Sequence, residues 1–314
     1  MNQQTLIDHL MKTGASITPG RADIVALTPL TRDDARASMN RFLTALHEAD
    51  ICRHDRANLA ERGERSVAHL ADGARAVVYH ASGALQYVSG LAPFQATYER
   101  LEEAPVLVRQ LEQAAQRLDL AAWVGERGSL AFERLWQTKA RGANRDQQLS
   151  DTLLVRATGA WRHAVGQIPV LGAASVALRL AGDGAVDALS LRIRHSDAEV
   201  LDTAPVIEAE LAARQLAERL VGVLGKSRER LPGDLVQSAT MRFGYLDLGK
   251  RKAQRVLAPA YVAQIVLQHR LERQAYVLAV SATERPYLEL PLFGSEAPQL
   301  RGRGLHPECR DTAS

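Results

Sequence analysis

Cysteine and aromatic residues are scarce in this chain of 314 residues. Only two cysteines occur, Cys52 and Cys309, and they lie far apart in no spacing typical of a metal site. Two cysteines are too few for a disulfide framework, which fits a reducing compartment. Aromatic residues make up only 5% of the sequence, so each one on a predicted strand is a candidate for the core or for a binding surface.

Long apolar runs are absent as well. No stretch approaches the roughly 18 consecutive apolar residues that identify a membrane-spanning helix, so we expect no membrane span. The first residues, MNQQTLIDHLMKTGAS, lack the basic and apolar regions of a secretory signal. We therefore expect a cytoplasmic protein. The alternative is an exported protein whose signal was removed ahead of residue 1.

A strong excess of charge of one sign is also missing. Lys and Arg number 39 against 36 Asp and Glu, which gives a net charge of +3. Nucleic-acid-binding domains usually carry a larger basic excess or a basic stripe. The clearest basic cluster, GKRKAQR at Gly249–Arg255, is typical of a solvated turn between strands. The sequence therefore predicts no nucleic-acid partner.

Motifs of catalytic and cofactor sites are missing too. The chain has no G-x-S-x-G elbow, no H-E-x-x-H, no cysteine pair, and no G-x-G-x-x-G between a strand and a helix. GVLGKS at Gly222–Ser227 ends like a phosphate loop, but it closes a predicted helix, whereas a phosphate loop precedes one. We expect no cofactor and no metal, and the sequence does not favour an enzyme.

What the sequence does contain is a repeated order of elements. Apolar residues make up 46%, enough for a packed core. The hydrophobic periodicity predicts a helix followed by antiparallel strands about three times, with helices that begin near Thr31, Ala104 and Ala204. The last helix is expected over 204–224, with Thr203 as its cap. The sequence predicts an α+β fold, with antiparallel β-sheets each covered on one face by a helix, in helix-plus-meander units repeated two to three times.

The same order divides the chain into units. Residues 1–100 are expected to form an N-terminal helix plus hairpin, and residues 101–202 a central helix and β-ribbon. Residues 203–292 are expected to form a C-terminal helix with antiparallel strands. Residues 293–314, with mixed Pro, Gly and Arg, are expected to be a loose tail.

The central ribbon is the best-marked segment, GQIPVLGAASVALRLAGDGAVDALSLRIR at 166–194. Apolar and polar residues alternate on both sides of a Gly-Asp-Gly turn, as in a sheet covered on one side. We expect the apolar face to pack under the 204–224 helix. Arg179, Arg192 and Arg194 would then face outward as a basic strip, which suits an acidic partner because guanidinium groups pair with carboxylates.

This ribbon also carries a family resemblance. IPVLGAASVALRLAGDGAVDALSLRIR resembles the central segment of PepSY-type and YycI-like proteins, and the following helix, MRFGYLDL and VLAPAYVAQIVL fit its closing elements. VVYHASGALQY is similar to the terminal PepSY hairpin. The resemblance is best from Trp161 to Ala282. It implies helix-plus-meander units, although such proteins are normally exported or membrane-tethered and no such segment is evident here.

Two classes of function remain open on these grounds. A non-catalytic binding or regulatory protein would engage a protein or peptide partner through a sheet face or edge, and sheet edges would also allow oligomers. Its binding residues would be the three arginines of the strip with Trp161, Tyr245 and Tyr261. The alternative is an enzyme or small-molecule carrier with a pocket between sheet and helices, which uses His163 or His195 beside a carboxylate such as Asp187 or Asp197.

Overall fold

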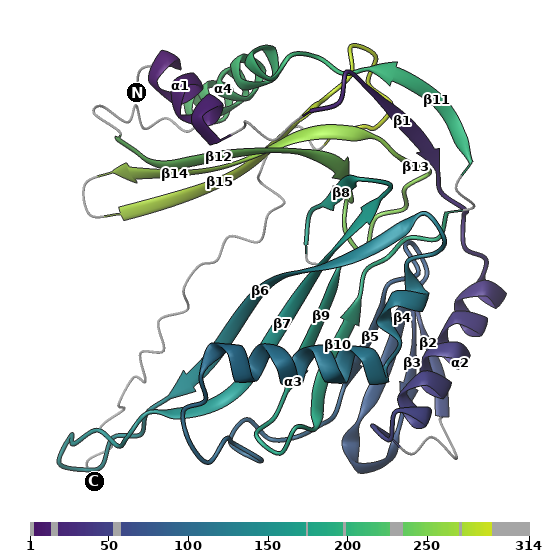
Figure 1. Ribbon diagram of the computed structural model, residues 1–314, viewed down its shortest axis with the longest axis vertical. Coiled ribbons are helices and arrows are strands. Elements are labelled where there is room, and N and C mark those ends of the chain that lie inside the picture. The colour runs from purple at the N-terminus through teal and green to yellow at the C-terminus, as the bar shows by residue number, and fades with distance from the viewer. Residues whose placement is uncertain are drawn as a thin grey trace, which may run out of the picture.

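Figure 1 shows the computed structural model of the chain. The structure describes residues 3–13, 18–52, 58–173, 175–196, 199–226, 235–269 and 272–290. Within these ranges it contains four α-helices, two short 3-10 helices and fifteen β-strands, nearly all of them paired antiparallel. The predicted α+β class with antiparallel sheets is confirmed. The predicted tail, Cys309 and Asp197 lie outside the described residues.

The helices are α1 (Gln3–Thr13), α2 (Arg32–Glu48), α3 (Ala104–Arg117) and α4 (Ala209–Lys226), with the 3-10 helices η1 (Ala71–Gly73) and η2 (Leu120–Trp123). The strands are β1 (Arg21–Ala26), β2 (Asn58–Arg62), β3 (Arg65–His69), β4 (Arg75–Tyr79), β5 (Leu85–Val88), β6 (Gly128–Ala140), β7 (Leu153–Val165), β8 (Ile168–Leu171), β9 (Val176–Leu180), β10 (Val186–Leu191), β11 (Val200–Pro205), β12 (Leu235–Leu246), β13 (Val256–Leu257), β14 (Pro259–His269) and β15 (Glu272–Ser281).

One large sheet organises the molecule. Its strands follow the order β15-β14-β12-β8-β7-β9-β10-β5-β4-β3-β2, with β6 paired to β7, and only the β8–β12 pair is parallel. Strands β11, β1 and β13 form a small second sheet. In Figure 1 the large sheet bends near β8 into an upper lobe, made of β12, β14 and β15 with α1 and α4, and a lower lobe, made of β2–β7, β9 and β10 with α2 and α3.

All four helices lie on one face of the large sheet. Tyr245 is on the same side of β12 as Phe243, which packs under the upper helices. Val165 is on the same side of β7 as Trp161, which packs in the core with α2 and α3. Because Tyr245 and Val165 belong to one small cluster with Val170, the helix-covered sides of the two lobes are continuous.

The two helices of the lower lobe form where the sequence predicts them. Thr31 and Asp34 make a reciprocal capping box that begins α2, and the helix buries Ala35, Met39, Phe42, Leu43 and Leu46. The second predicted helix, α3, lies across β7 and β9. Its core contains, among others, Met39, Phe42, Leu46, Leu111, Leu118, Trp161, Val176, Leu178, Leu189 and Leu191.

The third helix begins later than the sequence predicts. Residues 200–205 form β11, which pairs antiparallel with β1, and α4 starts at Ala209. Thr203 does not cap a helix, because its hydroxyl donates to Asp23 Oδ1 at 2.8 Å across the strand pair. Pairing with a distant strand therefore overrides a local pattern that looked like a helix start.

The central ribbon is confirmed as β9 and β10, but a different helix covers it. Its apolar side chains pack in the lower core with α2 and α3, whereas α4 packs against α1 and β15. The predicted boundary at residue 100 does not separate two cores, because β5 pairs with β10 in one sheet. Residues 3–13 likewise pack in the upper lobe with α4 and β12.

Candidate functional site

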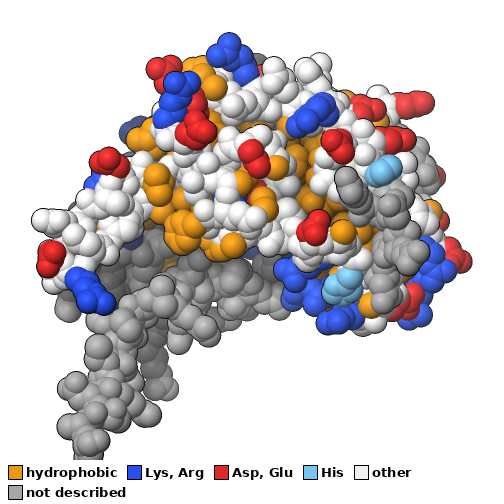
Figure 2. All heavy atoms as spheres, turned by 90° about the horizontal axis from the view of Figure 1, so that it is seen from below, with side chains coloured by type: hydrophobic (Ala, Val, Ile, Leu, Met, Phe, Trp, Pro, Cys, Tyr) orange, Lys and Arg blue, Asp and Glu red, His pale blue; other side chains and the backbone are white. Residues whose placement is uncertain are grey.

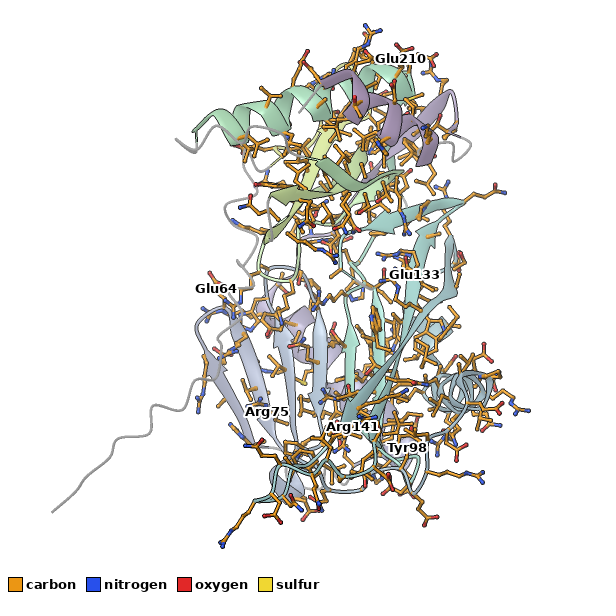
Figure 3. The ribbon with its side chains drawn as sticks, turned by 90° about the vertical axis from the view of Figure 1, so that its left-hand side faces the viewer. Glu64, Arg75, Tyr98, Glu133, Arg141 and Glu210 are labelled. Carbon is orange, nitrogen blue, oxygen red and sulfur yellow. The ribbon has the colours of Figure 1, made fainter. Side chains whose placement is uncertain are left out.

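The lower sheet has one face on which none of the described helices packs, here called the open face. Strand residues alternate between this face and the core, so their partners in register identify the face. Figure 3 shows α3 nearly end-on beside the sheet, with Arg75 on a strand away from it. The open face contains Val77, Tyr79, Gln86, Val88, Thr158, Ala160, Arg162, Ala177, Arg179, Ala188 and Ser190.

Basic side chains dominate this face. They come from Arg65, Arg75, Arg134, Arg156, Arg162, Arg179 and Arg192, together with Lys250 from the β12–β13 loop. The carboxylates in contact with them are Asp187 and Glu133. Lys and Arg side chains also gather on the side of the molecule where β2, β3 and β4 lie (right in Figure 2), where Arg62 and Arg75 are exposed.

Arg179 is held in place by a shared carboxylate. Arg156 Nε donates to Asp187 Oδ2 at 2.9 Å, and Arg179 Nε lies 2.6 Å from the same oxygen as an ion pair without hydrogen-bond alignment. Burial alone would raise the pKa of Asp187, but the Ser89 hydroxyl and the two guanidinium groups lower it overall. Two arginines on one carboxylate leave a net positive charge, and the Arg179 side chain is 41% exposed.

Arg192 lies close to Ser190 on the same face. Its backbone N–H donates to Ser175 O, which continues the β9–β10 pairing by one step beyond the strand end. Arg192 Nε is buried and has no hydrogen-bond partner among the described residues. The structure therefore places Arg179 and Arg192 on the open face, where the Arg179 side chain is 41% exposed and Arg192 is partly exposed.

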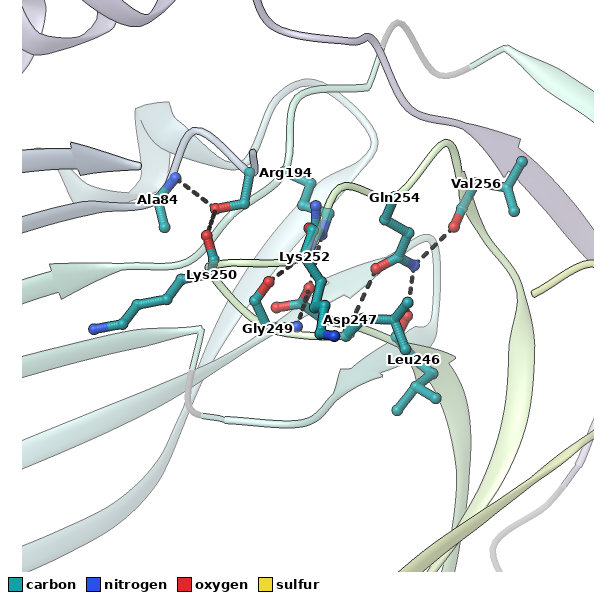
Figure 4. Close-up of polar contacts among 11 residues, drawn as sticks. Ala84, Arg194, Leu246, Asp247, Gly249, Lys250, Lys252, Gln254 and Val256 are labelled. Atoms are coloured by element: carbon teal, nitrogen blue, oxygen red, sulfur yellow. Dashed lines mark hydrogen bonds and ion pairs between the residues drawn. The ribbon is translucent and has the colours of Figure 1, made fainter. Parts of the chain in front are cut away.

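The third arginine of the predicted strip is placed differently. Arg194 follows β10, and its guanidinium is buried against the β12–β13 loop (Figure 4). It donates to Asp247 Oδ1 at 2.7 Å, and to the carbonyl oxygens of Gly249 and Lys252 at 2.9 and 3.0 Å. The prediction that Arg194 faces outward is wrong, because the loop supplies three acceptors that hold its buried guanidinium inward.

The same loop brings Lys250 onto the open face beside Tyr79. Ser82 Oγ donates to Lys250 O at 2.8 Å, which fixes the loop on the β4–β5 turn (Figure 4). Lys250 Nζ lies 4.6 Å from the Tyr79 ring centroid and 3.2 Å from Gln86 Oε1. Tyr79 OH donates to that same oxygen at 3.1 Å. The basic turn predicted to be merely solvated is thus docked on the sheet.

Sequence reasoning did not single out Tyr79, Gln86 or Lys250. The alternation in VVYH places Tyr79 on a strand, and the GKRKAQR cluster contains Lys250, but nothing local joins them. The contact spans 164 residues between Gln86 and Lys250, so only tertiary folding creates it.

The three predicted aromatic binding residues do not form a common surface. Trp161 is buried in the lower core with its ring edge-on to Phe132 at 5.3 Å. Tyr261 is buried in the upper core and donates to Ile207 O at 2.9 Å. Tyr245 is buried in the small cluster between them, where desolvation raises its pKa to about 12. Their positions on the helix-covered side make them core residues, so the structure does not place these three predicted binding residues on one exposed surface.

No ion pair joins His163 or His195 to Asp187 in the described part of the chain. His163 is only 5% exposed, its Nε2 has no hydrogen-bond partner among the described residues, and burial lowers its pKa to about 4. His195 is exposed and lies beyond the end of β10, close to Leu85 and Leu191. Asp187 is bound by arginines instead. No group of three or more His, Cys, Asp and Glu in the described ranges is placed to hold a metal ion.

Two large grooves lie beside helices, and neither is lined by His163 or His195. One, of about 910 Å³, lies between α4 and the segment after β15, and another, of about 630 Å³, lies at the ends of α2 and α3. His195 lines a cavity of about 20 Å³, which is room for about one water molecule and not for a substrate. The alternative of a histidine-based pocket gains no support from this geometry.

No protein-family model matches this chain, and no curated protein matches it. Within the described ranges, none of the helices combines the length and the apolar character that crossing a lipid bilayer requires.

Proposed function

We propose that this is a non-catalytic binding or regulatory protein that engages an acidic protein or peptide partner through the open face of the lower sheet. The observation that carries the proposal is the charge of that face, where arginines outnumber the carboxylates that contact them. A rigid sheet presents these cations in fixed register, which reduces the entropy lost on binding.

The contacts within the face favour a partner that excludes water. An exposed ion pair contributes only about 0–1 kcal/mol, so scattered arginines alone would bind weakly. Asp187 pairs with Arg179 through Nε, and the Arg179 side chain remains 41% exposed. A partner that covers Arg179 and Arg192 together would gain charge-assisted hydrogen bonds from donors that are already positioned.

The edges of the large sheet are a second place where the proposed partner could bind. The large sheet ends at β2 on one side and at β15 on the other, and Val277 on β15 is 53% exposed. A partner strand, or a second copy of this chain, could extend the sheet there by backbone pairing.

We also propose that the chain is built from PepSY-like helix-plus-meander units. The order of elements supports this: α2 precedes β2–β5, α3 precedes β6, β7, β9 and β10, and α4 precedes β12, β14 and β15. In each case the strands are neighbours in the sheet, and the preceding helix packs on the helix-covered face.

The test is the binding of a labelled decaglutamate peptide to the whole chain, measured by fluorescence anisotropy at low and high salt. Reversing charge with Arg179→Glu and Arg192→Glu together should weaken binding by about tenfold or more at low salt, because screening reduces the difference at high salt. The matched control is Arg109→Glu with Arg145→Glu, two exposed arginines with the same change in net charge. An affinity that depends on neither the double change nor the ionic strength would contradict the proposal.

A further inference from the structure

Tyr79 lies where three separate segments meet on the open face. It is only 5% exposed and ends β4. Arg65 on β3 is directly opposite Tyr79 in the antiparallel register. Lys250 reaches over the Tyr79 ring from the β12–β13 loop. Arg65 and Lys250 are each partly exposed, so solvent reaches the two cationic side chains beside Tyr79.

Two donors converge on a single neutral oxygen at this point. Tyr79 OH and Lys250 Nζ both donate to Gln86 Oε1, at 3.1 and 3.2 Å. A carboxylate or phosphate oxygen is a stronger acceptor for such donors than an amide oxygen, particularly when one donor is an ammonium group. The side chain of Gln86 also reaches Ser190 Oγ at 3.5 Å, so it can swing toward β10 when another acceptor arrives.

In the part of the chain that the structure describes, no ion pair joins Arg65 or Lys250 to an acid. Two acids of neighbouring segments are engaged elsewhere, since Asp187 binds Arg156 and Asp247 binds Arg194. The positive charge around Tyr79 is therefore uncompensated within the described chain.

We propose that Tyr79, Lys250 and Arg65 form a site for one anionic oxygen group, a carboxylate or a phosphate, carried by the acidic partner. This inference rests on the proposed function and identifies the point of the open face at which one charged group of the partner is recognised. Tyr79 supplies a hydroxyl donor, Lys250 an ammonium donor, and Arg65 a planar guanidinium able to bind two oxygens at once.

The titration of Tyr79 is consistent with this assignment. Burial on its own would raise the pKa of Tyr79, but Lys250 and Arg65 outweigh burial and lower the pKa below its usual value. The same positive potential that stabilises a phenolate would stabilise the anionic group of a ligand.

The site is also rigidly supported. The Ser82 contact to Lys250 O and the three bonds from Arg194 hold the loop that carries Lys250. Arg65 and Tyr79 belong to paired strands. Binding therefore needs little rearrangement beyond the side chain of Gln86.

The experiment is a titration of the whole chain with inorganic phosphate and, separately, with acetate, followed by two-dimensional amide NMR. We expect saturable shifts at Tyr79, Gln86 and Lys250. Lys250→Met should weaken phosphate binding by about tenfold and Tyr79→Phe by about fivefold, because each removes one donor to the anion. Arg251→Gln, an exposed neighbour in the same loop, should change it less than about twofold.

The outcomes separate this inference from the proposed function. Shifts that are absent, or that persist unchanged in Lys250→Met and Tyr79→Phe, would overturn the anion site even if decaglutamate still binds through Arg179 and Arg192. Phosphate binding that Lys250→Met abolishes, without any peptide binding, would support the anion site and contradict the proposed function. A response to phosphate but not acetate would identify a phosphorylated group, and the reverse a carboxylate. Thermal melting of each variant shows that it is folded.

Discussion

Arg194 Nε donates to Asp247 Oδ1 at 2.7 Å, with the two side chains only 6% and 9% exposed. This pair joins the end of the central ribbon, in the lower lobe, to the loop that leaves β12 of the upper lobe. It therefore fixes the loop that places Lys250 on the open face.

Removing one partner of this pair should be costly. Asp247→Ala leaves the Arg194 guanidinium buried without its counter-charge, and we expect a loss of about 3–5 kcal/mol in the free energy of unfolding. Urea denaturation followed by circular dichroism measures it. Asp146→Ala, at an exposed hairpin tip, is the control and should change stability by less than about 0.5 kcal/mol. A small effect at Asp247 would show that the loop is not held by this pair.

The turn of the central ribbon gives a second prediction. Gly184 has φ of +80°, and a Cβ placed there meets no atom within 4 Å, so a substitution is opposed by backbone conformation and not by space. Gly184→Val should destabilise the protein by roughly 1–3 kcal/mol. Gly20→Ala, where φ is not positive and space is also open, should change little. An unchanged melting temperature for Gly184→Val would contradict the turn conformation.

Local patterns predicted those elements whose signals are local. The Thr31 cap, the alternation in β9 and β10, and the turn at Gly184 depend on neighbouring residues, and each is present. The sequence predicts no strand at β6. The alternation of side chains that would identify this strand is interrupted at Glu133, an extra residue in a bulge that shifts the alternation after Phe132. A single sequence records neither such a shift nor a pairing with a distant strand.

The sequence predicted only part of the candidate site, again because it reveals local signals and not contacts between distant segments. Arg179 lies on the open face because strand alternation determines its side, and Arg192 follows because its bond to Ser175 O extends the pairing by one residue. Arg194 was misplaced because the strand ends at Leu191, after which the alternation no longer applies. Lys250 and Tyr79 were missed because their contact exists only after the β12–β13 loop docks on the β4–β5 turn.

A substitution at Gly222 should raise the stability of the protein, whereas the substitution at Gly184 should lower it. It lies inside α4, it is exposed, its φ is not positive, and a Cβ there meets nothing within 4 Å. Gly222→Ala should therefore stabilise the protein by about 0.5–1 kcal/mol, because alanine favours the helix and restricts the unfolded chain. Thermal unfolding with the wild-type protein alongside is the measurement, and a lower melting temperature would argue against a regular helix at this position.

The burial of His163 predicts how the stability of the folded protein depends on pH. Burial lowers its pKa from 6.5 to about 4, so between these values the unfolded chain binds a proton that the folded protein excludes. Stability should therefore be fully present above about pH 6.5 and fall as the pH drops toward 4, by about 3 kcal/mol in total from this group. His163→Leu should flatten that part of the profile, whatever its effect on stability at pH 7, while His195→Leu, at an exposed site, should leave the slope unchanged. Urea unfolding from pH 7 to pH 4 measures all three proteins, and equal slopes in wild type and His163→Leu would mean that other groups cause the acid sensitivity.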